Sequence, residues 1–247
     1  MHRHAVPLTL LLLSCRHGFT DHGDAPVVVL DYHDTVLVDG PLAYWRLGGQ
    51  AVVARDELGR DDGQYSGACT LGATGAVAND TAVTFDGASC KVVLGTGYGF
   101  TDLAPFTLEA WVSLAPGGAQ FRNILGAQTR DALNPIDGYA LIIAPGGLTL
   151  ERSIAGTNFK TPVFALADGA FAHVVATYDG ATTRTFVDGA LVGTMPDTRP
   201  MPAYSTPLQI GASVTGNYIA GTIDEVAIYD TALTSERIAA HRDAASR

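Results

Sequence analysis

Residues 106–113 read Phe-Thr-Leu-Glu-Ala-Trp-Val-Ser, and the side chains along this segment alternate in character. In an extended chain every second side chain lies on the same face. Phe106, Leu108, Ala110 and Val112 therefore share one apolar face. A two-residue period of this kind is typical of a β-strand that packs into a core. Further short strands are predicted at residues 81–86, 139–144, 148–152, 173–178, 185–187, 190–193, 208–210 and 222–229.

Turn residues separate these strands. Asp179-Gly180 and Asp188-Gly189 each stand between two runs, and Pro145-Gly146-Gly147 stands between two more. An Asp-Gly pair favours a tight hairpin, because glycine adopts the positive φ that a type I′ turn needs. The sequence therefore predicts an all-β fold, with two antiparallel sheets packed as a single sandwich. One short helix is predicted near the C-terminus, capped by Thr234 or Ser235.

The composition limits the possible partners. The chain has 247 residues, of which 47% are hydrophobic, and this is sufficient for a folded domain. Its formal net charge is −10, which argues against nucleic-acid binding because phosphate contacts need a basic surface. We find no long linker inside residues 44–243, so one domain is predicted over residues 36–247.

The N-terminal residues indicate export. A short basic start, Met1 to His4, precedes an apolar run that ends at Leu13. The run is shorter than the roughly 20 residues of a membrane-spanning helix and is typical of a signal peptide. The sequence Leu12-Leu13-Ser14-Cys15 resembles a bacterial lipobox, which implies cleavage after residue 14 and lipidation of Cys15. The expected location is the bacterial cell envelope, with membrane contact through the lipid alone; plain secretion is the alternative.

A polar segment is expected to connect the anchor to the domain. Residues 15–35 contain several histidines and aspartates, including His33 and Asp34. Their spacing matches no zinc-binding pattern. The segment is therefore predicted to be a flexible, solvated tether.

Two further cysteines, Cys69 and Cys90, flank a turn-rich stretch and the strand predicted at 81–86. In an exported domain their pairing is favoured, and such a disulfide stabilises by roughly 3 kcal/mol in the chain-entropy model. Two buried free thiols are the alternative.

Several segments together resemble the laminin-G-like, concanavalin A-like jelly-roll family. They are residues 40–48, 81–87, 106–112, 173–180, 186–189, 221–230 and 232–238, in family order over about residues 32–243. The resemblance implies a two-sheet jelly roll with a curved, concave face. It does not fix the function, because this fold occurs in lectins, adhesion modules, carbohydrate-binding modules and some glycosidases.

The sequence does not contain the acids that a glycosidase of this fold needs. Hydrolysis usually takes two facing carboxylates, and the active glucanases resemble one another in an E-x-D-x-x-E strand that is missing here. Glu109 has no acidic residue two positions away. Asp224 and Glu225 are adjacent, so they are expected on opposite faces of a strand. His173 has no acid nearby in sequence and is predicted as a core or edge residue. No catalytic residue is therefore predicted, and the protein is expected not to be an enzyme.

Asp224 is expected on an apolar face, because alternation places it with Val226 and Ile228. Such a carboxylate needs a hydrogen bond or a cation. The family resemblance implies a structural calcium with Asp224 as one ligand, and Asp56 is a candidate for a second. Relatives commonly have a glutamate where Gly49-Gln50 stands, and without it the site would be weakened or lost. The alternative is that backbone amides or tyrosine hydroxyls satisfy Asp224.

Aromatic residues offer two kinds of role. Trp45 and Trp111 could stack on sugars, but both lie in predicted strands and are favoured as packing residues. Loop residues Tyr98, Tyr204, Asn217 and Tyr218 are expected to be exposed and better placed for ligand contact. The protein is predicted to be a monomeric, non-catalytic module that binds glycans or surface proteins. A structural or adhesion subunit of the envelope, or a glycoside hydrolase, are the alternatives.

Overall fold

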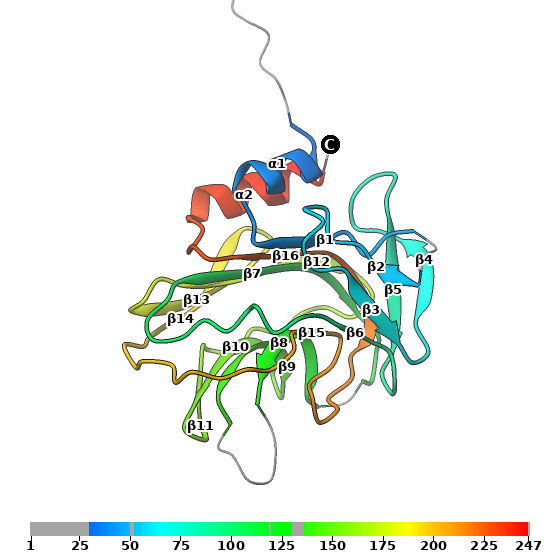
Figure 1. Ribbon diagram of the computed structural model, residues 1–247. Coiled ribbons are helices and arrows are strands. Elements are labelled where there is room, and N and C mark those ends of the chain that lie inside the picture. The colour runs from blue at the N-terminus through cyan, green and yellow to red at the C-terminus, as the bar shows by residue number, and fades with distance from the viewer. Residues whose placement is uncertain (1–29, 50–51, 119, 130–135, 247) are drawn as a thin grey trace, which may run out of the picture.

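The alternating run at 106–113 forms strand β7 (Phe106–Leu114), which lies in the middle of a sheet between β12 and β16. The computed structural model describes residues 30–49, 52–118, 120–129 and 136–246, and it has two stacked antiparallel sheets (Figure 1). This confirms the predicted all-β, two-sheet jelly roll with a short C-terminal helix. In the described residues, no helix is both long enough and apolar enough to span a membrane.

Each sheet has eight strands within the described ranges. Sheet A runs in the order β14 (Ala190–Pro196), β13 (Thr182–Val187), β12 (Phe171–Tyr178), β7, β16 (Ala220–Tyr229), β5 (Thr81–Asp86) and β4 (Thr70–Thr74), and β1 (Ala43–Trp45) also pairs with β16. Sheet B runs in the order β11 (Thr157–Lys160), β10 (Gly147–Ile154), β9 (Gly138–Ala144), β8 (Arg122–Gln128), β15 (Gln209–Ile210), β6 (Lys91–Val93), β3 (Gly63–Ser66) and β2 (Val53–Ala54).

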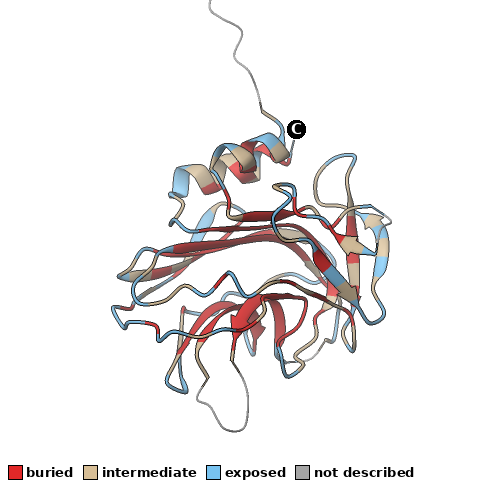
Figure 2. Ribbon diagram, in the orientation of Figure 1, coloured by how far each residue is buried: buried red, intermediate tan, exposed pale blue. Residues whose placement is uncertain are grey.

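The core lies between the two sheets (Figure 2). The apolar face of β7 packs there as predicted, and Phe106 and Leu108 are almost fully buried in one cluster with Leu141 and Leu150 of sheet B. One glycine is required by this packing. Gly211 has φ 82°, and a Cβ at this position would lie 2.2 Å from the ring of Phe85. A side chain at residue 211 would therefore force the sheets apart.

Two helices lie against the outer face of sheet A (Figure 1). The predicted helix is α2 (Ser235–Ala244), and the side chain of Thr234 caps it. The second, α1 (Tyr32–Val38), lies partly in the segment predicted to be a tether. Tyr32, the first residue of α1, is buried, so the folded part of the chain includes residue 32 and does not begin at residue 36. The predicted signal and Cys15 lie outside the described residues.

The two internal cysteines are joined. Cys69 and Cys90 form a disulfide with a Cα–Cα distance of 4.9 Å. The predicted pairing is therefore confirmed, and the alternative of two free thiols is not. The bridge closes a loop that contains β4, β5 and the turn between them, and it joins the two ends of this hairpin opposite the turn.

Candidate functional site

A β-bulge interrupts β16 at Glu225. Asp224 pairs with Trp111 of β7, whereas Ala227 pairs with Glu109, so β16 has one more residue than β7 in this interval. Glu225 has φ 51°, in the left-handed region that costs an L-residue roughly 1–2 kcal/mol. Bulges change the direction in which side chains point, and they are frequent next to functional sites.

The bulge brings two acids together on the outer face of sheet A. The sequence predicted Asp224 and Glu225 on opposite faces, and Asp224 on the face of Val226 and Ile228. Both predictions are wrong, because Val226 and Ile228 pack between the sheets. The carboxylates of Asp224 and Glu225 instead meet that of Asp80, with one oxygen of each acid within 4.8 Å of the other two.

One cation lies among these acids. The guanidinium of Arg46 donates from Nη2 to Asp80 at 2.5 Å and from Nε to Glu225 at 3.2 Å. The hydroxyl of Tyr44 also donates to Glu225. Three carboxylates therefore face one guanidinium. When all are ionised, the cluster has an excess of two negative charges.

The two carboxylate oxygens of Asp224 differ in their surroundings. Its side chain is fully buried, and Oδ2 accepts a hydrogen bond of 2.8 Å from the backbone N–H of Ala76. Oδ1 is also buried and has no partner among the described residues. Burial raises the pKa of Asp224 to about 7 and, with Asp80 and Asp224 nearby, that of Glu225 to about 9. An oxygen-binding cation would remove this excess charge and use the free oxygen, so the acids present fit a calcium ion.

Asp56 does not belong to this cluster. Its two oxygens accept hydrogen bonds from four backbone amides, those of Tyr44, Leu58, Arg60 and Asp61. The side chain therefore organises the loop after β2. The structure places Asp80 beside Asp224, where Asp56 was predicted. Asp80 directly precedes β5, which pairs with β16, so its role depends on strand order.

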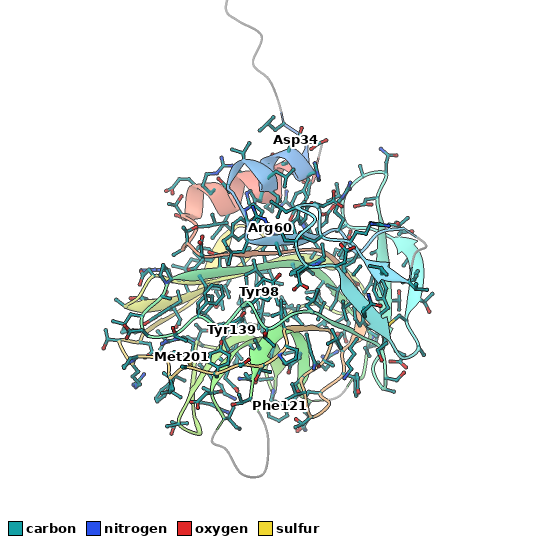
Figure 3. All side chains as sticks on the ribbon, viewed as in Figure 1. Asp34, Arg60, Tyr98, Phe121, Tyr139 and Met201 are labelled. Atoms are coloured by element: carbon teal, nitrogen blue, oxygen red, sulfur yellow. A yellow bond between two sulfur atoms is a disulfide. The ribbon has the colours of Figure 1, made fainter. Side chains whose placement is uncertain are left out.

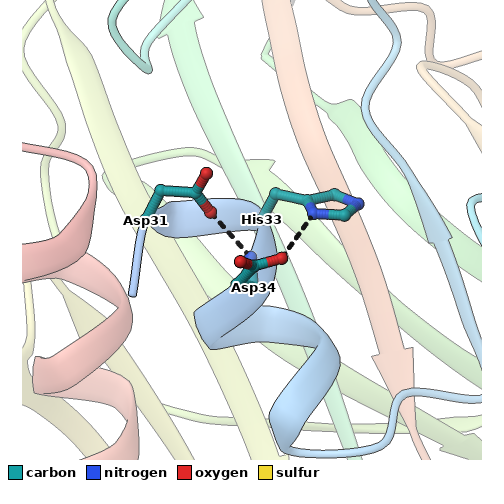
Figure 4. Close-up of side chains that lie close together, drawn as sticks. All are labelled: Asp31, His33 and Asp34. Carbon is teal, nitrogen blue, oxygen red and sulfur yellow. Dashed lines mark hydrogen bonds and ion pairs between the residues drawn. The ribbon is translucent and has the colours of Figure 1, made fainter. Parts of the chain in front are cut away.

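A second acidic group caps α1 (Figure 4). Asp31 accepts a hydrogen bond of 2.8 Å from the N–H of Asp34, whose carboxylate lies 3.2 Å from Nδ1 of His33. One potential ligand atom of each of these three side chains lies within 4.8 Å of the other two, but Asp31 and Asp34 are exposed. The Asp31–Asp34 bond is an ordinary N-terminal cap, and it explains the group without a metal.

Glu109 lies under the two helices and is fully buried. Its carboxylate receives hydrogen bonds from four side chains, namely Tyr32 at 2.9 Å, Tyr229 at 3.0 Å, His173 at 2.7 Å and His241 at 2.9 Å. Burial acts to raise its pKa, but the two histidines hold it well below the usual value. Glu109 is therefore fully engaged by the fold. His173 is a core residue, as predicted, and its acidic partner comes from the neighbouring strand.

The outer face of sheet B presents a different surface. We call it the sheet B groove: a pocket of about 210 Å³ lined by Phe121, Asn123, Gln128, Ile142, Glu151, Asn158, Lys160 and Asn217. Phe121 is 43% exposed and lies on the side of the molecule away from the helices (Figure 3). The groove therefore combines an exposed aromatic ring with amide and charged side chains.

Hydrogen bonds hold the floor of this groove. Nε2 of Gln128 donates to Glu151 and to Ser153, both at 2.9 Å, and all three side chains are buried. Nζ of Lys160 lies 2.8 Å from the other oxygen of Glu151 and 5.8 Å from the centre of the Phe121 ring. The polar groups are thus fixed in position before any ligand arrives.

The predictions for the two tryptophans are confirmed, and those for the four loop residues are confirmed only in part. Trp45 is fully buried and Trp111 is 7% exposed, so both pack, as predicted. Tyr98 is only 7% exposed and packs its ring against Trp45, so its predicted exposure is wrong (Figure 3). Asn217 lines the sheet B groove. Tyr204 and Tyr218 are half-buried and do not line it.

Residues 78–239 match a laminin G family model, described as the concanavalin A-like lectin/glucanases superfamily. No curated protein matches the sequence. The matched segment contains Asp80, Asp224 and Glu225, together with every residue of the sheet B groove.

Solved structures share the fold. The binding domain of botulinum neurotoxin serotype D gives a TM-score of 0.66 at 12% identity, over 85% of this chain and 52% of that one. Domain 4 of AbnA, a GH43 extracellular arabinanase from Geobacillus stearothermophilus, in complex with arabinotriose, gives 0.62 at 16% identity, over 83% and 98%. Trypanosoma rangeli sialidase with sialic acid gives 0.60 at 17% identity, over 82% and 32%. The chain spans about half the length of the neurotoxin domain, and these identities show a shared fold alone.

Proposed function

The chain belongs to the concanavalin A-like lectin/glucanases superfamily, and from this we propose that it is a non-catalytic module that binds a neutral glycan in the sheet B groove. The observation that carries the proposal is the arrangement of that groove. A sugar ring packs its C–H groups on an aromatic face while amide and carboxylate groups bond its hydroxyls. Phe121 offers the face, and Asn123, Glu151 and Asn158 offer the polar groups.

The two outer faces differ in a way that favours sheet B. On sheet A, α1 and α2 lie over the middle of the face (Figure 1). On sheet B, the groove is open. The net charge of −10 disfavours polyanionic ligands, so a neutral glycan is the better match. The structure of an arabinanase domain with arabinotriose supports a sugar ligand for this fold.

The absence of catalysis is part of the proposal. A glycosidase needs two carboxylates that face one substrate. Among the described residues that line the groove, Glu151 is the one carboxylate, and Lys160 pairs with it. Glu109 bonds four other side chains beneath the helices. Neither acid therefore has a second acid placed to share a glycosidic bond.

Export and lipid anchoring complete the proposal. A disulfide is typical of proteins that fold in an oxidising compartment. Fatty-acid labelling of cells that express the full chain should mark the protein at Cys15, and the label should be lost in Cys15→Ser. Equal labelling of both proteins would refute lipidation.

A glycan array tests the binding function directly. Purified residues 30–247 should give signals on neutral oligosaccharides, and Phe121→Ala should weaken the strongest of them at least tenfold. Phe164→Ala is a matched control, because Phe164 is 39% exposed and does not line the groove. Flat signals on the whole array would refute glycan binding. An equal loss in both variants would refute the assignment to the groove.

A further inference from the structure

A second pocket lies at one end of the sandwich, where the segment after β7, the β9–β10 turn and residues 165–168 meet. Its volume is about 260 Å³, and Arg122 lies in its wall. The rest of the wall is mixed: Leu114, Ile143, Pro145 and Leu166 supply aliphatic groups, and Gln120 and Asp168 supply polar ones. It shares no residue with the sheet B groove, so it is a separate site.

Arg122 carries a charge that the described residues do not balance. The residue is only 9% exposed, and within the described residues its side chain makes one hydrogen bond, from Nη1 to the carbonyl of Ala115 at 3.4 Å. Its Nε is buried without a partner among the described residues. The Nε of Arg152 is likewise buried without a partner among the described residues, but the guanidinium of Arg152 pairs with Asp197 and stacks on Tyr178, which Arg122 does not match. A buried charge without a counter-ion is costly, so Arg122 is expected to have a partner that is not part of the chain.

The fold holds this guanidinium in place. A Cβ at Gly118 would lie 2.7 Å from Nη1 of Arg122, so the loop passes directly over the group. Arg122 begins β8 and pairs with Ile143, which anchors the other end of the side chain. The guanidinium therefore has little freedom to turn away into solvent. A preorganised guanidinium favours a planar, two-oxygen anion.

We propose that this pocket binds a carboxylate carried on a small apolar body, with Arg122 as its counter-charge. The aliphatic side chains of Leu166, Pro145 and Ile143 in the wall favour an aliphatic body over a hydroxylated one. Asp168 disfavours a doubly charged anion such as phosphate, because it adds a negative charge to the same pocket. The volume is below that of most drug-sized pockets and suits a branched short-chain acid or one terminal residue of a peptide.

Titration with four small molecules tests the proposal and distinguishes two possible origins of the bound carboxylate, a free acid and a peptide C-terminus. Isovalerate stands for a free acid, N-acetyl-leucine for a peptide C-terminus, N-acetyl-leucine amide for the same body without charge, and glucuronate for a hydroxylated acid. NMR shifts of the Arg122 Nε–H and of the Gly146 amide should report saturable binding of the first two at millimolar concentration. The amide and glucuronate should bind at least tenfold more weakly. Tighter binding of isovalerate would identify a free acid as the natural ligand, and tighter binding of N-acetyl-leucine would identify a peptide C-terminus.

Two variants keep the test decisive. Arg122→Gln should abolish the shift at Gly146, whereas Asp168→Asn should strengthen binding severalfold because it removes a repulsive charge. Asp168 is exposed and in no ion pair within the described residues, so its variant is expected to fold. If Arg122→Gln does not fold, the carboxylate affinity of Asp168→Asn alone tests the proposal. Equal binding of the carboxylate and its amide, or unchanged affinity in Asp168→Asn, would overturn the proposal.

Discussion

His241 and Asp39 join the last helix to the first, with Nε2 of the histidine 2.7 Å from Oδ2 of the aspartate. On the other side of the ring, Nδ1 of His241 lies 2.9 Å from Glu109. An ionised carboxylate only accepts hydrogen bonds, so both ring nitrogens must carry protons. His241 is therefore an imidazolium, buried between two carboxylates, and Arg237 also pairs with Asp39 at 2.9 Å.

The first prediction concerns the pH dependence of stability. Burial acts to lower the pKa of His241, but Glu109 and Asp39 raise it above the ordinary value. A raised folded-state pKa means that the stabilisation is complete below about pH 6.5 and is lost as the pH rises through the folded pKa. The free energy of unfolding in urea should therefore fall from pH 6.5 upward, by at most about 1.4 kcal/mol per pH unit for this group.

Comparison with His241→Gln isolates this contribution. The variant should be less stable at pH 6 and should show a smaller fall between pH 6.5 and 9. Asp224 and Glu225 also have raised pKa values, but they contribute equally to both proteins. His33→Gln is a matched control, since His33 is a partly exposed histidine of the other helix and its variant should keep the full slope. Identical slopes in all three proteins would show that His241 is not protonated.

The second prediction concerns calcium. Added calcium should raise the melting temperature, and a chelator should reverse the effect, because the ion would use the free Oδ1 of Asp224 and the carboxylates of Asp80 and Glu225. Asp224→Asn should remove the response. Asp34→Asn changes the exposed group at the start of α1 and should leave the response intact. A melting temperature that does not change with calcium would refute the site.

The third prediction concerns the same residue without metal. The pKa of Asp224 is raised by burial to about 7, so at pH 8 its ionised form is destabilising. Stability from this group is therefore greatest below about pH 4 and is lost as the pH rises through 7. Asp224→Asn removes this cost while its amide oxygen can still accept from Ala76. In the presence of chelator at pH 8, we expect the free energy of unfolding in urea to be about 2–4 kcal/mol higher for Asp224→Asn than for the unchanged protein. At pH 5 we expect a much smaller difference between the two proteins.

The strands could be predicted from the sequence because strand and turn preferences depend on residues that are close together in the chain. The alternation of residues 106–113 and the Asp-Gly pairs act within a few residues, and β5, β7 and β9 lie where they were expected. The helix α1 was missed because seven residues in a polar segment carry a weak signal. Its one clear mark was the Asp31–Asp34 spacing of an N-terminal cap.

The candidate sites depend on pairing between distant strands, which no local pattern contains. Asp80 reaches Asp224 because β5 lies beside β16, and Glu109 reaches His241 because α2 folds back over β7. The bulge could not be predicted either. Glutamate is not a residue that favours positive φ, and the extra residue becomes visible only when β16 is aligned with β7.

The last prediction links the disulfide to the acid cluster. Asp80 lies inside the loop that Cys69 and Cys90 close, while Asp224 and Glu225 lie outside it. The double variant Cys69→Ala, Cys90→Ala should lose about 3 kcal/mol of unfolding free energy in urea. It should also lose part of its stabilisation by calcium, because the loop that presents Asp80 is less constrained. A control in the loop but away from the acids, Thr70→Ala, should keep the calcium response. A double variant that loses stability yet keeps the full response would show that the disulfide supports the fold without positioning Asp80.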